Sequence, residues 1–505
     1  MTEYLVDGFT NGFRIEHQNQ AHDIFGKNSD RIRELVEIAR KKIRSEVEAG
    51  RIAGPFDEPP FQPFQISPLN LREKKTPGKY RLLHNLAWPY DDSAVNSNIP
   101  ESAKRVKYST VHDAIKSIMK FPKGAFTAKT DISDAYRIIP LHPDEYPKLG
   151  IYFEGQYYFD KNLPQGCGSS AKIFETFVTA LQAIFQHYYP QAEVTHLLDD
   201  FFFAARNRAQ CQFYLDAFLK LCSDIGVPLA PEKTTSPATD TVFLGILLDT
   251  MAWLAKLPQD KVLEYVTDVQ QVLGKKKVTR KVLESVAGKL SFAAAVVPAR
   301  PFLRRIFNLI YTVDKPYHNI RITKEVQRDL EIWLEFLQGY NGVTYFRSLQ
   351  IIPSTAINLS SDACKRGLGA CYGSKWIQCA YPIEWQDLHI STLEFYPLFV
   401  LISMFGHLMT NSNVLFLCDN EAVVEIVQKQ STKDPNNMRI MRALILMIIK
   451  FNISLSAKHV PGKNNVLCDR ISRFQVTPQL LAEHNMDSKA TSIPSYLLPK
   501  NFTDL

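Results

Sequence analysis

The chain has 505 residues, enough for about three domains of ordinary size. Its 45% hydrophobic and 22% charged content indicates a globular protein and excludes a disordered one. The eight cysteines show neither a Cys-x-x-Cys pair nor zinc-ligand spacing, which excludes a disulfide scaffold, and the formal charge of +7 fits a polyanionic partner only weakly.

The sequence predicts an intracellular protein, in the cytoplasm and/or the nucleus. Met1–Gly8 lacks the basic-then-apolar pattern of a signal peptide. The longest apolar stretch that we identify, Ile440–Ile449, is interrupted by Arg442 and is too short to cross a membrane. We therefore expect no signal peptide, no transmembrane segment and no membrane partner.

The N-terminal part predicts a helix followed by extended chain. Residues 1–28 are polar, and we expect them to be loosely attached. A helix should run from Ser29-Asp30 to about Glu48. Residues 67–86 predict two strands joined by a basic turn, whose cations are Lys74, Lys75, Lys79 and Arg81. A solvated charged face is one interpretation of this cluster; phosphate binding is favoured because an acid-bearing strand follows.

Two segments then predict a strand and a helix that begins among small residues. Residues 124–139 form a strand that ends at Asp131 and runs into a turn. A hairpin follows over 149–159. The segment beginning Leu163-Pro-Gln-Gly enters a helix that continues to about His187, and its glycines allow close backbone approach to a ligand or a neighbouring helix.

Residues 194–203 place two adjacent carboxylates, Asp199 and Asp200, inside an apolar run. Burying charge without a partner is costly, so the pattern favours a tight hairpin with both acids at its tip. A solvated Asp-Asp turn is the alternative. The apolar flanks and a third acid in a matching setting, Asp131, favour a divalent-metal site.

Helical segments dominate the next part of the chain. A helix covers about 207–225, a loop containing Lys233 follows, and 241–248 predicts one strand. Residues 256–345 are helix-rich and basic, as in an ordinary amphipathic bundle.

A second set of acids follows residue 350. Asp362 lies on a strand, Glu394 in the first turn of an apolar helix, Asp419 at the end of a buried strand and Asp469 on a helix. Any one of them alone is more often a cap or a surface charge. Four acids in such settings predict a second shared site.

Taken together, these motifs resemble those of known enzyme families. Asp131, Leu163-Pro-Gln-Gly, Asp199-Asp200, the segment 226–234 and Phe243-Leu-Gly resemble the fingers and palm of reverse transcriptases, in order, over about 180 residues. The order Asp, Glu, Asp, Asp over about 355–475 resembles ribonuclease H. The resemblance implies an α+β right-hand polymerase followed by an α/β ribonuclease H-like domain with a mixed central sheet.

The resemblance also implies domain limits. They are an N-terminal extension and helix (1–50), fingers and palm (51–255), thumb and connection (256–350), a ribonuclease H-like domain (351–478) and a C-terminal tail (479–505). By this resemblance, the basic bundle over 256–345 is a thumb that binds the backbone of template–primer through sequence-independent phosphate contacts.

The activity implied is RNA-directed DNA synthesis together with cleavage of the RNA in an RNA–DNA hybrid. The partners would be an RNA template, a DNA primer, the hybrid and deoxynucleoside triphosphates; the oligomeric state stays open. Mg²⁺ is the expected metal, with Mn²⁺ as an alternative. The seven acids that would hold metal are Asp131, Asp199, Asp200, Asp362, Glu394, Asp419 and Asp469.

Further residues acquire nucleotide-binding roles by the same resemblance. Lys74 and Arg81 would contact the triphosphate, and Tyr136 would lie beneath the sugar. The remaining candidates are Gln165 near the nucleotide, Lys233, and the Ile132 carbonyl as an additional metal ligand.

The order of the domains resembles that of retrotransposon polyproteins, and so does the C-terminal segment Lys458-His-Val-Pro-Gly-Lys-Asn-Asn. DIRS-like elements, which use a tyrosine recombinase, are most similar, with gypsy-type elements second. Two alternatives stay open: an inert, domesticated nucleic-acid-binding descendant, and a polymerase whose ribonuclease domain is only structural. The presence of all seven acids favours an active enzyme with both sites.

Overall fold

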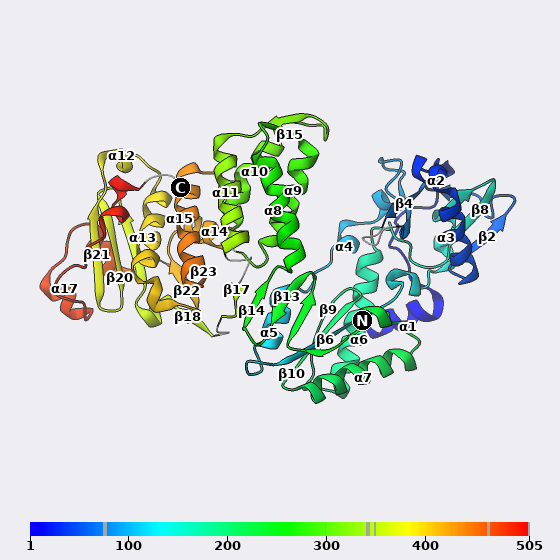
Figure 1. Ribbon diagram of the computed structural model, residues 1–505, viewed down its shortest axis with the longest axis horizontal. Helices are drawn as coiled ribbons and strands as arrows, with labels where there is room; N and C mark the ends of the chain where they lie inside the picture. Colours follow the sequence, from blue (N-terminus) through cyan, green and yellow to red (C-terminus); the bar gives the residue numbers. More distant parts are fainter. Residues whose placement is uncertain (74–77, 298, 340–343, 348–349, 462–464, 503–505) are drawn as a thin grey trace. The chain divides into compact units, whose positions relative to one another are not determined.

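A computed structural model describes the chain except for residues 74–77, 298, 340–343, 348–349, 462–464 and 503–505. The chain divides into two compact units, Met1–Leu244 and Gly245–Leu505. Figure 1 colours the first from blue to green and the second from green to red. Each unit buries a hydrophobic core of its own. The finer domain limits expected at 50, 255, 350 and 478 stay predictions.

The first unit contains a four-stranded sheet in the order β11-β6-β10-β9, in which neighbours are antiparallel. Because side chains alternate along a strand, Phe201 and Phe203 contact Phe218 on one face, and Phe202 contacts Phe243 on the other. Both faces of β10 are therefore buried, which explains its unbroken apolar sequence. The bounds are β6 Phe126–Asp131, β9 Glu193–Leu197, β10 Asp200–Ala205 and β11 Thr235–Ala238. The strand that follows along the chain, β12 Asp240–Phe243, is not part of this sheet.

Three helices of this unit pack against the four-stranded sheet: α5 (Val111–Ile118), α6 (Ser170–Tyr188) and α7 (Arg208–Asp224). Phe174, Phe177 and Phe185 of α6 are buried in the same cluster as Phe201 and Phe203 of β10. The predicted helix beginning near the Leu163-Pro-Gln-Gly turn and the predicted helix after the Asp199-Asp200 hairpin are therefore both present, and both support the sheet edge that carries the acids.

A second sheet in this unit has five strands in the order β1-β3-β7-β8-β2, and β4 pairs with β5 as a separate hairpin. The predicted hairpins over 149–159 and 67–86 are thus confirmed. The bounds are β1 Ile24–Phe25, β2 Ile52–Phe56, β3 Gln65–Ile66, β4 Leu69–Glu73, β5 Tyr80–His84, β7 Gly150–Phe153 and β8 Gln156–Asp160. This unit also contains α1 (Thr2–Asn11) and α4 (Glu101–Lys104).

Three expectations about local structure were wrong. Residues 1–28 are not loosely attached: Phe13 and Ile15 are buried, and the Phe13 amide donates to the Pro140 carbonyl. The helix expected over 30–48 is broken at Leu35 (φ −117°, ψ 41°) into α2 (Asp30–Glu34) and α3 (Val36–Glu48). The single strand expected over 241–248 is interrupted because Leu244 and Gly245 both have positive φ.

The second unit begins with a small sheet and a helical bundle. Strand β14 pairs antiparallel with β13 and with β17. The predicted helix-rich segment is confirmed, with a two-stranded ladder β15–β16 added to it. The bounds are β13 Ile246–Asp249, β14 Leu254–Lys256, α8 Gln259–Leu273, β15 Lys277–Thr279, α9 Arg280–Ala293, α10 Arg304–Ile310, β16 Asn319–Arg321, α11 Lys324–Gly339 and β17 Thr344–Tyr345.

The remainder of this unit holds two three-stranded sheets, one antiparallel (β19-β20-β21) and one parallel (β18-β22-β23). They contact each other through β19 and β22. The bounds are β18 Ile351–Pro353, β19 Ser360–Cys364, β20 Gly367–Tyr372, β21 Lys375–Ala380, β22 Asn413–Cys418 and β23 Ser454–His459. The helices are α12 Ile383–Gln386, α13 Ile390–Phe405, α14 Glu421–Lys429, α15 Pro435–Phe451, α16 Val466–Ser472 and α17 Pro478–Glu483.

Two helices cover the antiparallel sheet, α13 and α16. Gly369 of β20 has no room for a side chain, because a Cβ would lie 2.4 Å from the Ser472 amide nitrogen. The prediction about apolar stretches was wrong: Ile390–Met409, which contains α13, is long and apolar enough to cross a membrane by length and composition. Its most apolar window is 72% buried, and its composition is accounted for by packing against β19, β20 and α15.

Candidate active sites

The first candidate site lies where β6 ends and the β9–β10 hairpin turns. A two-residue turn, Leu198-Asp199, joins the strands, with Leu198 at φ 52°. Asp200 is the first residue of β10 and lies opposite Asp131 in the β6 ladder. The Ile132 amide donates to the Asp199 carbonyl at 2.9 Å. Backbone pairing therefore brings Asp131, Asp199 and Asp200 together at one edge of the sheet.

The three carboxylates repel one another in a poorly solvated position. Asp131 is only 4% exposed. Burial raises the pKa of Asp199, and the charge of Asp131 raises it further. Burial, followed by the charges of Asp131 and Asp199, raises the pKa of Asp200 to about 6. Such a cluster is stable as carboxylates only beside positive charge.

Lys233 supplies positive charge at this edge. Its Nζ lies 2.6 Å from Oδ1 of Asp131. Burial lowers the pKa of Lys233, but the hydrogen bond to Asp131 and the charges of all three acids outweigh burial and raise it. Within the parts of the chain that the structure describes, no three Asp, Glu, His or Cys side chains are arranged as a metal site. The donors nevertheless suit a hard divalent cation, since all are carboxylate oxygens at one sheet edge.

Tyr136 lies next to the acids on a strained segment. It belongs to the 3₁₀ turn Ala135–Ile138, and both Asp134 (φ 56°) and Ala135 (φ 25°) have left-handed backbone. Its ring meets Phe174 edge-on, with centroids 5.5 Å apart. Burial raises the pKa of Tyr136 to about 12, with Tyr108 and Asp199 contributing and Arg81 opposing. The half-buried ring therefore lies within electrostatic reach of Asp199 and Arg81.

The Leu163-Pro-Gln-Gly turn contacts strand β5. The His84 amide donates to the Gln165 carbonyl at 3.0 Å. Gly166 has φ +137°, and a Cβ there would lie 1.9 Å from the His84 carbonyl oxygen. Glycine is therefore required, and it positions Gln165 beside the hairpin that carries Arg81. Lys74, the other predicted triphosphate contact, lies outside the described residues.

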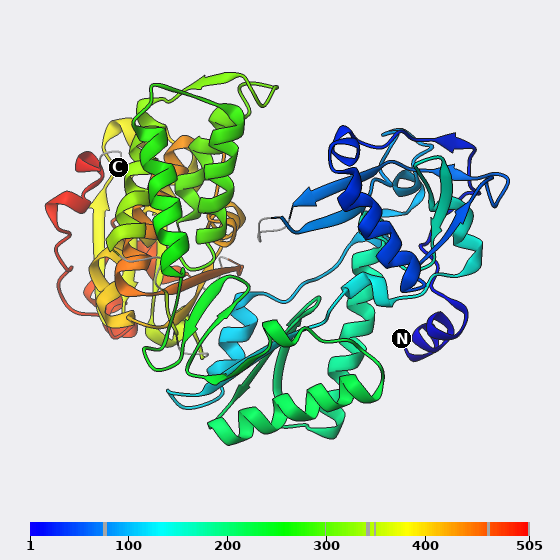
Figure 2. The same ribbon diagram turned by 45° about the vertical axis from the view of Figure 1, so that its right-hand side comes forward.

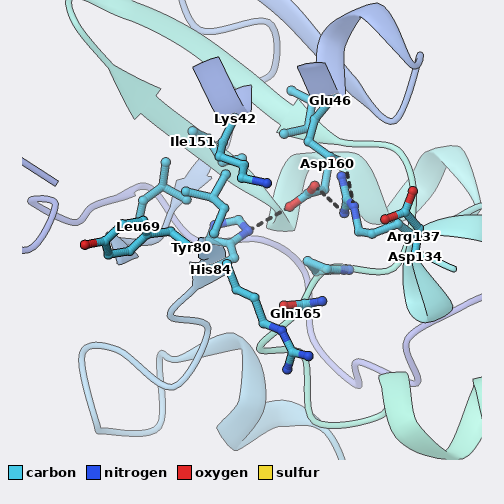
Figure 3. A pocket seen from close by; sticks show the side chains of 14 residues that line it. Lys42, Glu46, Leu69, Tyr80, His84, Asp134, Arg137, Ile151, Asp160 and Gln165 are labelled. Atoms are coloured by element: carbon cyan, nitrogen blue, oxygen red, sulfur yellow. Dashed lines mark hydrogen bonds and ion pairs between the residues drawn. The ribbon is translucent and has the colours of Figure 1, made fainter. Parts of the chain in front are cut away.

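Gln165 and Arg81 line a pocket whose lining also includes an ion network (Figure 3). Arg137 lies 2.7 Å from Asp160 and 2.9 Å from Glu46, and His84 Nδ1 lies 2.9 Å from Asp160. Sequence reasoning missed this network, because its members come from four separate segments and no local pattern marks them. It ties β5, on which Arg81 lies, to the core of the unit.

The second candidate site gathers the four later acids. Asp362 lies on β19, Asp419 follows β22 and Asp469 lies on α16. Glu394 is in the second turn of α13, not the first as expected. Burial raises the pKa of Asp362 to about 6, and the charges of Asp469 and Asp419 add to it. The structure therefore brings these acids into one electrostatic cluster.

Glu394 also has a raised pKa. Burial raises the pKa of Glu394 to about 7; a hydrogen bond from Asn420 opposes this, while Asp419 and Asp362 raise it further. The hydroxyl of Ser472 donates to Asp362 at 2.8 Å, and Nε of Arg473 donates to Asp469 at 2.7 Å. Sequence reasoning missed these three supporting residues. Ser472 and Arg473 follow Asp469 at helical spacing, which was a usable signal.

Comparisons with known proteins identify a family match for part of the first unit. Residues 72–248 match the family model described as reverse transcriptase (RNA-dependent DNA polymerase). The Gag-Pro-Pol polyprotein of Mason-Pfizer monkey virus is 26% identical over 266 residues, which is 50% of this chain and 14% of that protein. The chain therefore spans only a small part of the length of such relatives.

Two solved structures resemble the fold over most of the chain. The foamy viral protease-reverse transcriptase dRH in complex with double-stranded DNA has a TM-score of 0.52 at 16% identity, covering 89% of this chain and 72% of that one. The foamy viral protease-reverse transcriptase in complex with RNA/DNA hybrid has a TM-score of 0.52 at 14% identity, covering 88% and 56%. The predicted fold class, a right-hand polymerase with a ribonuclease H-like domain, is confirmed.

Proposed function

We propose that this chain, whose residues 72–248 form a reverse transcriptase domain of retroelement type, is an RNA-directed DNA polymerase that copies retroelement RNA into DNA. The observation that carries the proposal is the convergence of Asp131, Asp199 and Asp200 at one sheet edge. Its partners would be an RNA template, a DNA primer and deoxynucleoside triphosphates. Extension of a DNA primer on an RNA template by the purified chain is the test, and binding without extension would favour the inert alternative.

The polymerase residues have separable roles in this proposal. Asp131, Asp199 and Asp200 would hold Mg²⁺ or Mn²⁺, with the Ile132 carbonyl as an additional ligand; such ions neutralise charge on the attacking and leaving oxygens of phosphoryl transfer. Arg81 would bind phosphate oxygens, since Arg81 pairs with Arg72 across the β4–β5 ladder and two like charges on paired residues gain from an anion. Gln165 and Tyr136 would orient base and sugar.

We also propose a second activity, cleavage of the RNA strand in an RNA–DNA hybrid. Asp362, Glu394, Asp419 and Asp469 would hold the metal ions, which lower the pKa of bound water and so supply a nucleophile. The charges of Asp469 and Asp419 raise the pKa of Asp362, and those of Asp419 and Asp362 raise the pKa of Glu394, which supports a single shared site. As its element of origin, we propose a DIRS-like retrotransposon, with a gypsy-type element second.

Tyr136 is expected to exclude ribonucleotides. Its ring packs edge-on against Phe174 within electrostatic reach of Asp199, so its bulk would clash with a 2′-hydroxyl of a nucleotide bound at the acids. Tyr136→Ala should improve the kcat/KM for a ribonucleotide relative to its deoxynucleotide by about tenfold or more, equal to about 1.4 kcal/mol. Tyr136→Phe is the matched control and should discriminate as the wild type does. An unchanged ratio in an active alanine variant would show that another residue excludes the hydroxyl.

Metal binding is expected to raise the melting temperature more at pH 8 than at pH 5. The folded pKa values of Asp200, Asp362 and Glu394, about 6, 6 and 7, lie above those of unfolded chains. The folded state therefore binds more protons between about pH 4 and 7, and its stability falls as pH rises through that window.

At pH 8 a divalent cation removes this repulsion, whereas at pH 5 it must displace protons. Thermal unfolding in EDTA and in MgCl₂, at both pH values and equal ionic strength, measures the difference. Equal gains from MgCl₂ at the two pH values would contradict the assignment of these acids as metal ligands.

A further inference from the structure

Two segments of the second unit, 274–281 and 311–324, form a strongly basic surface that we call the tip surface. They contain eight Lys and Arg residues and one acid, Asp314. This surplus of seven equals the formal charge of the whole chain, +7, so the remaining residues balance. The cations are Lys275, Lys276, Lys277, Arg280, Lys281, Lys315, Arg321 and Lys324.

The tip surface is built on the β15–β16 ladder, beyond the C-terminal end of α8 (Figures 1 and 2). Val278 and Ile320 face each other in this ladder and are buried. Lys277 and Arg321 form the next pair and are exposed. Like charges directly opposite each other on a ladder are destabilising. The pairing therefore favours an anion bound over this face.

Arg280 holds the second segment in place. Its guanidinium donates to the Asp314 carbonyl at 2.8 Å and to Glu284 at 2.7 Å, and its amide donates to the His318 carbonyl at 2.8 Å. The Lys281 amide donates to the Pro316 carbonyl at 2.9 Å. Arg280 therefore has a structural role in the tip surface, whereas the other seven cations are exposed to solvent.

Two tyrosines of the second segment, Tyr311 and Tyr317, have most of their surface in water. Tyr311 is 72% exposed and Tyr317 is 67% exposed. His318 meets the Tyr317 ring edge-on at 5.0 Å, and Nζ of Lys315 lies 6.0 Å from its centre. Exposed rings interleaved with cations are what unpaired bases need, because bases stack on the rings while the cations bind phosphates. A duplex keeps its bases stacked inside and would leave both rings unused.

We propose that the tip surface binds single-stranded nucleic acid, through phosphate contacts from its lysines and base stacking on Tyr311 and Tyr317. The surface includes none of the seven acids of the two candidate active sites. It also differs from the expected grip on duplex backbone, since it needs unstacked bases. The proposed binding does not depend on polymerase activity.

Fluorescence anisotropy with the full chain tests both parts of the proposal. The probes are a labelled 12-nucleotide thymidine oligomer and an abasic oligomer with the same number of phosphates. Tyr311→Ala/Tyr317→Ala should weaken thymidine-oligomer binding about tenfold and leave abasic binding within twofold, since each stacked base is worth about 1–3 kcal/mol. Tyr311→Phe/Tyr317→Phe is the matched control and should retain binding.

Lys275→Gln/Lys276→Gln/Lys277→Gln should weaken binding of both probes and reduce the slope of log K against log salt by about 2, because each phosphate contact to a single strand contributes about 0.7. The matched control removes three exposed lysines elsewhere, Lys220, Lys429 and Lys489, by the same change to Gln. It should bind as the wild type does.

Acetylation of lysines, read by mass spectrometry, locates the bound strand. Lys275, Lys276 and Lys277 should be protected by the thymidine oligomer, whereas Lys220 should not. Equal weakening by the tip and control lysine variants, undiminished thymidine binding in the double alanine variant, or protection by duplex alone would each overturn the proposal. If the wild type fails to extend primers but shows this protection, the proposed polymerase function fails and the tip surface stands.

Discussion

Primer extension on an RNA template is expected to fall by about 10³-fold or more when Asp199 and Asp200 are both replaced by Asn. The substitution removes two of the three carboxylates that meet at the edge of the β11-β6-β10-β9 sheet. Metal-based charge stabilisation is worth several kcal/mol in phosphoryl transfer, and each 1.36 kcal/mol is tenfold in rate. Single-turnover extension with wild-type and variant protein at saturating template–primer measures the loss.

The matched control removes two carboxylates from the same unit without touching the site. Asp216→Asn/Asp224→Asn changes exposed acids of α7 and should extend primers at the wild-type rate. Cleavage of RNA in a hybrid should persist in the Asp199→Asn/Asp200→Asn variant, since the four acids of the second candidate site belong to the other unit. If the Asp199→Asn/Asp200→Asn variant extends primers at the wild-type rate, the assignment of Asp199 and Asp200 to the polymerase reaction is wrong.

The sequence predicted the sheet edge that carries Asp131, Asp199 and Asp200, because the apolar residue pattern and the cost of burying charge lead to the same prediction there. Adjacent acids inside an apolar run have few stable placements, so the hairpin at Asp199-Asp200 follows from the cost of burying charge. Its partner strand ending at Asp131 was predicted as well, but the direct register of Asp131 with Asp200 is seen only in the folded chain. The roles of these acids stay predictions until activity is measured.

Other features depend on contacts between distant segments and leave no local pattern. Asp329 of α11 and Arg442 of α15 are both fully buried and form an ion pair, yet each looks like an ordinary helical charge in the sequence. Arg442, which interrupts the apolar stretch 440–449, is explained by this partner and by the Phe302 ring 4.9 Å away. Such pairs are stable only when both members are present, and one member alone predicts nothing.

The breaks at Leu35 and Leu244-Gly245 show a second limit on the prediction of helices and strands from sequence. Apolar periodicity continues through both positions, so periodicity alone predicts an unbroken helix and an unbroken strand. At Leu35 the backbone leaves the helical region, while Leu35 and Val36 still pack on the same core as Ile32 and Ile43. Core packing therefore overrides local propensity at this position.

Hybrid-RNA cleavage is expected to fall by about 10³-fold or more in Asp419→Asn, while DNA synthesis continues. Asp419 is the acid whose charge acts on both Asp362 and Glu394, so it is central to the cluster. Losing one metal ligand forfeits several kcal/mol of transition-state stabilisation. Cleavage of a labelled RNA strand in a hybrid measures the effect, and Asp487→Asn, at an exposed acid of the same unit, is the matched control.

A second readout for Asp419→Asn does not require activity. Burial is the main reason that the pKa of Glu394 is about 7, but the charge of Asp419 raises it further. Removing that charge should therefore lower the pKa of Glu394 in metal-free protein, provided that the Asn420 hydrogen bond is kept, and carboxyl carbon chemical shifts of ¹³C-labelled glutamate followed against pH measure it. Loss of cleavage together with a lowered pKa places Asp419 in the cluster by electrostatics as well as by kinetics. Wild-type cleavage together with an unchanged pKa would mean that the hybrid is cut at some other site.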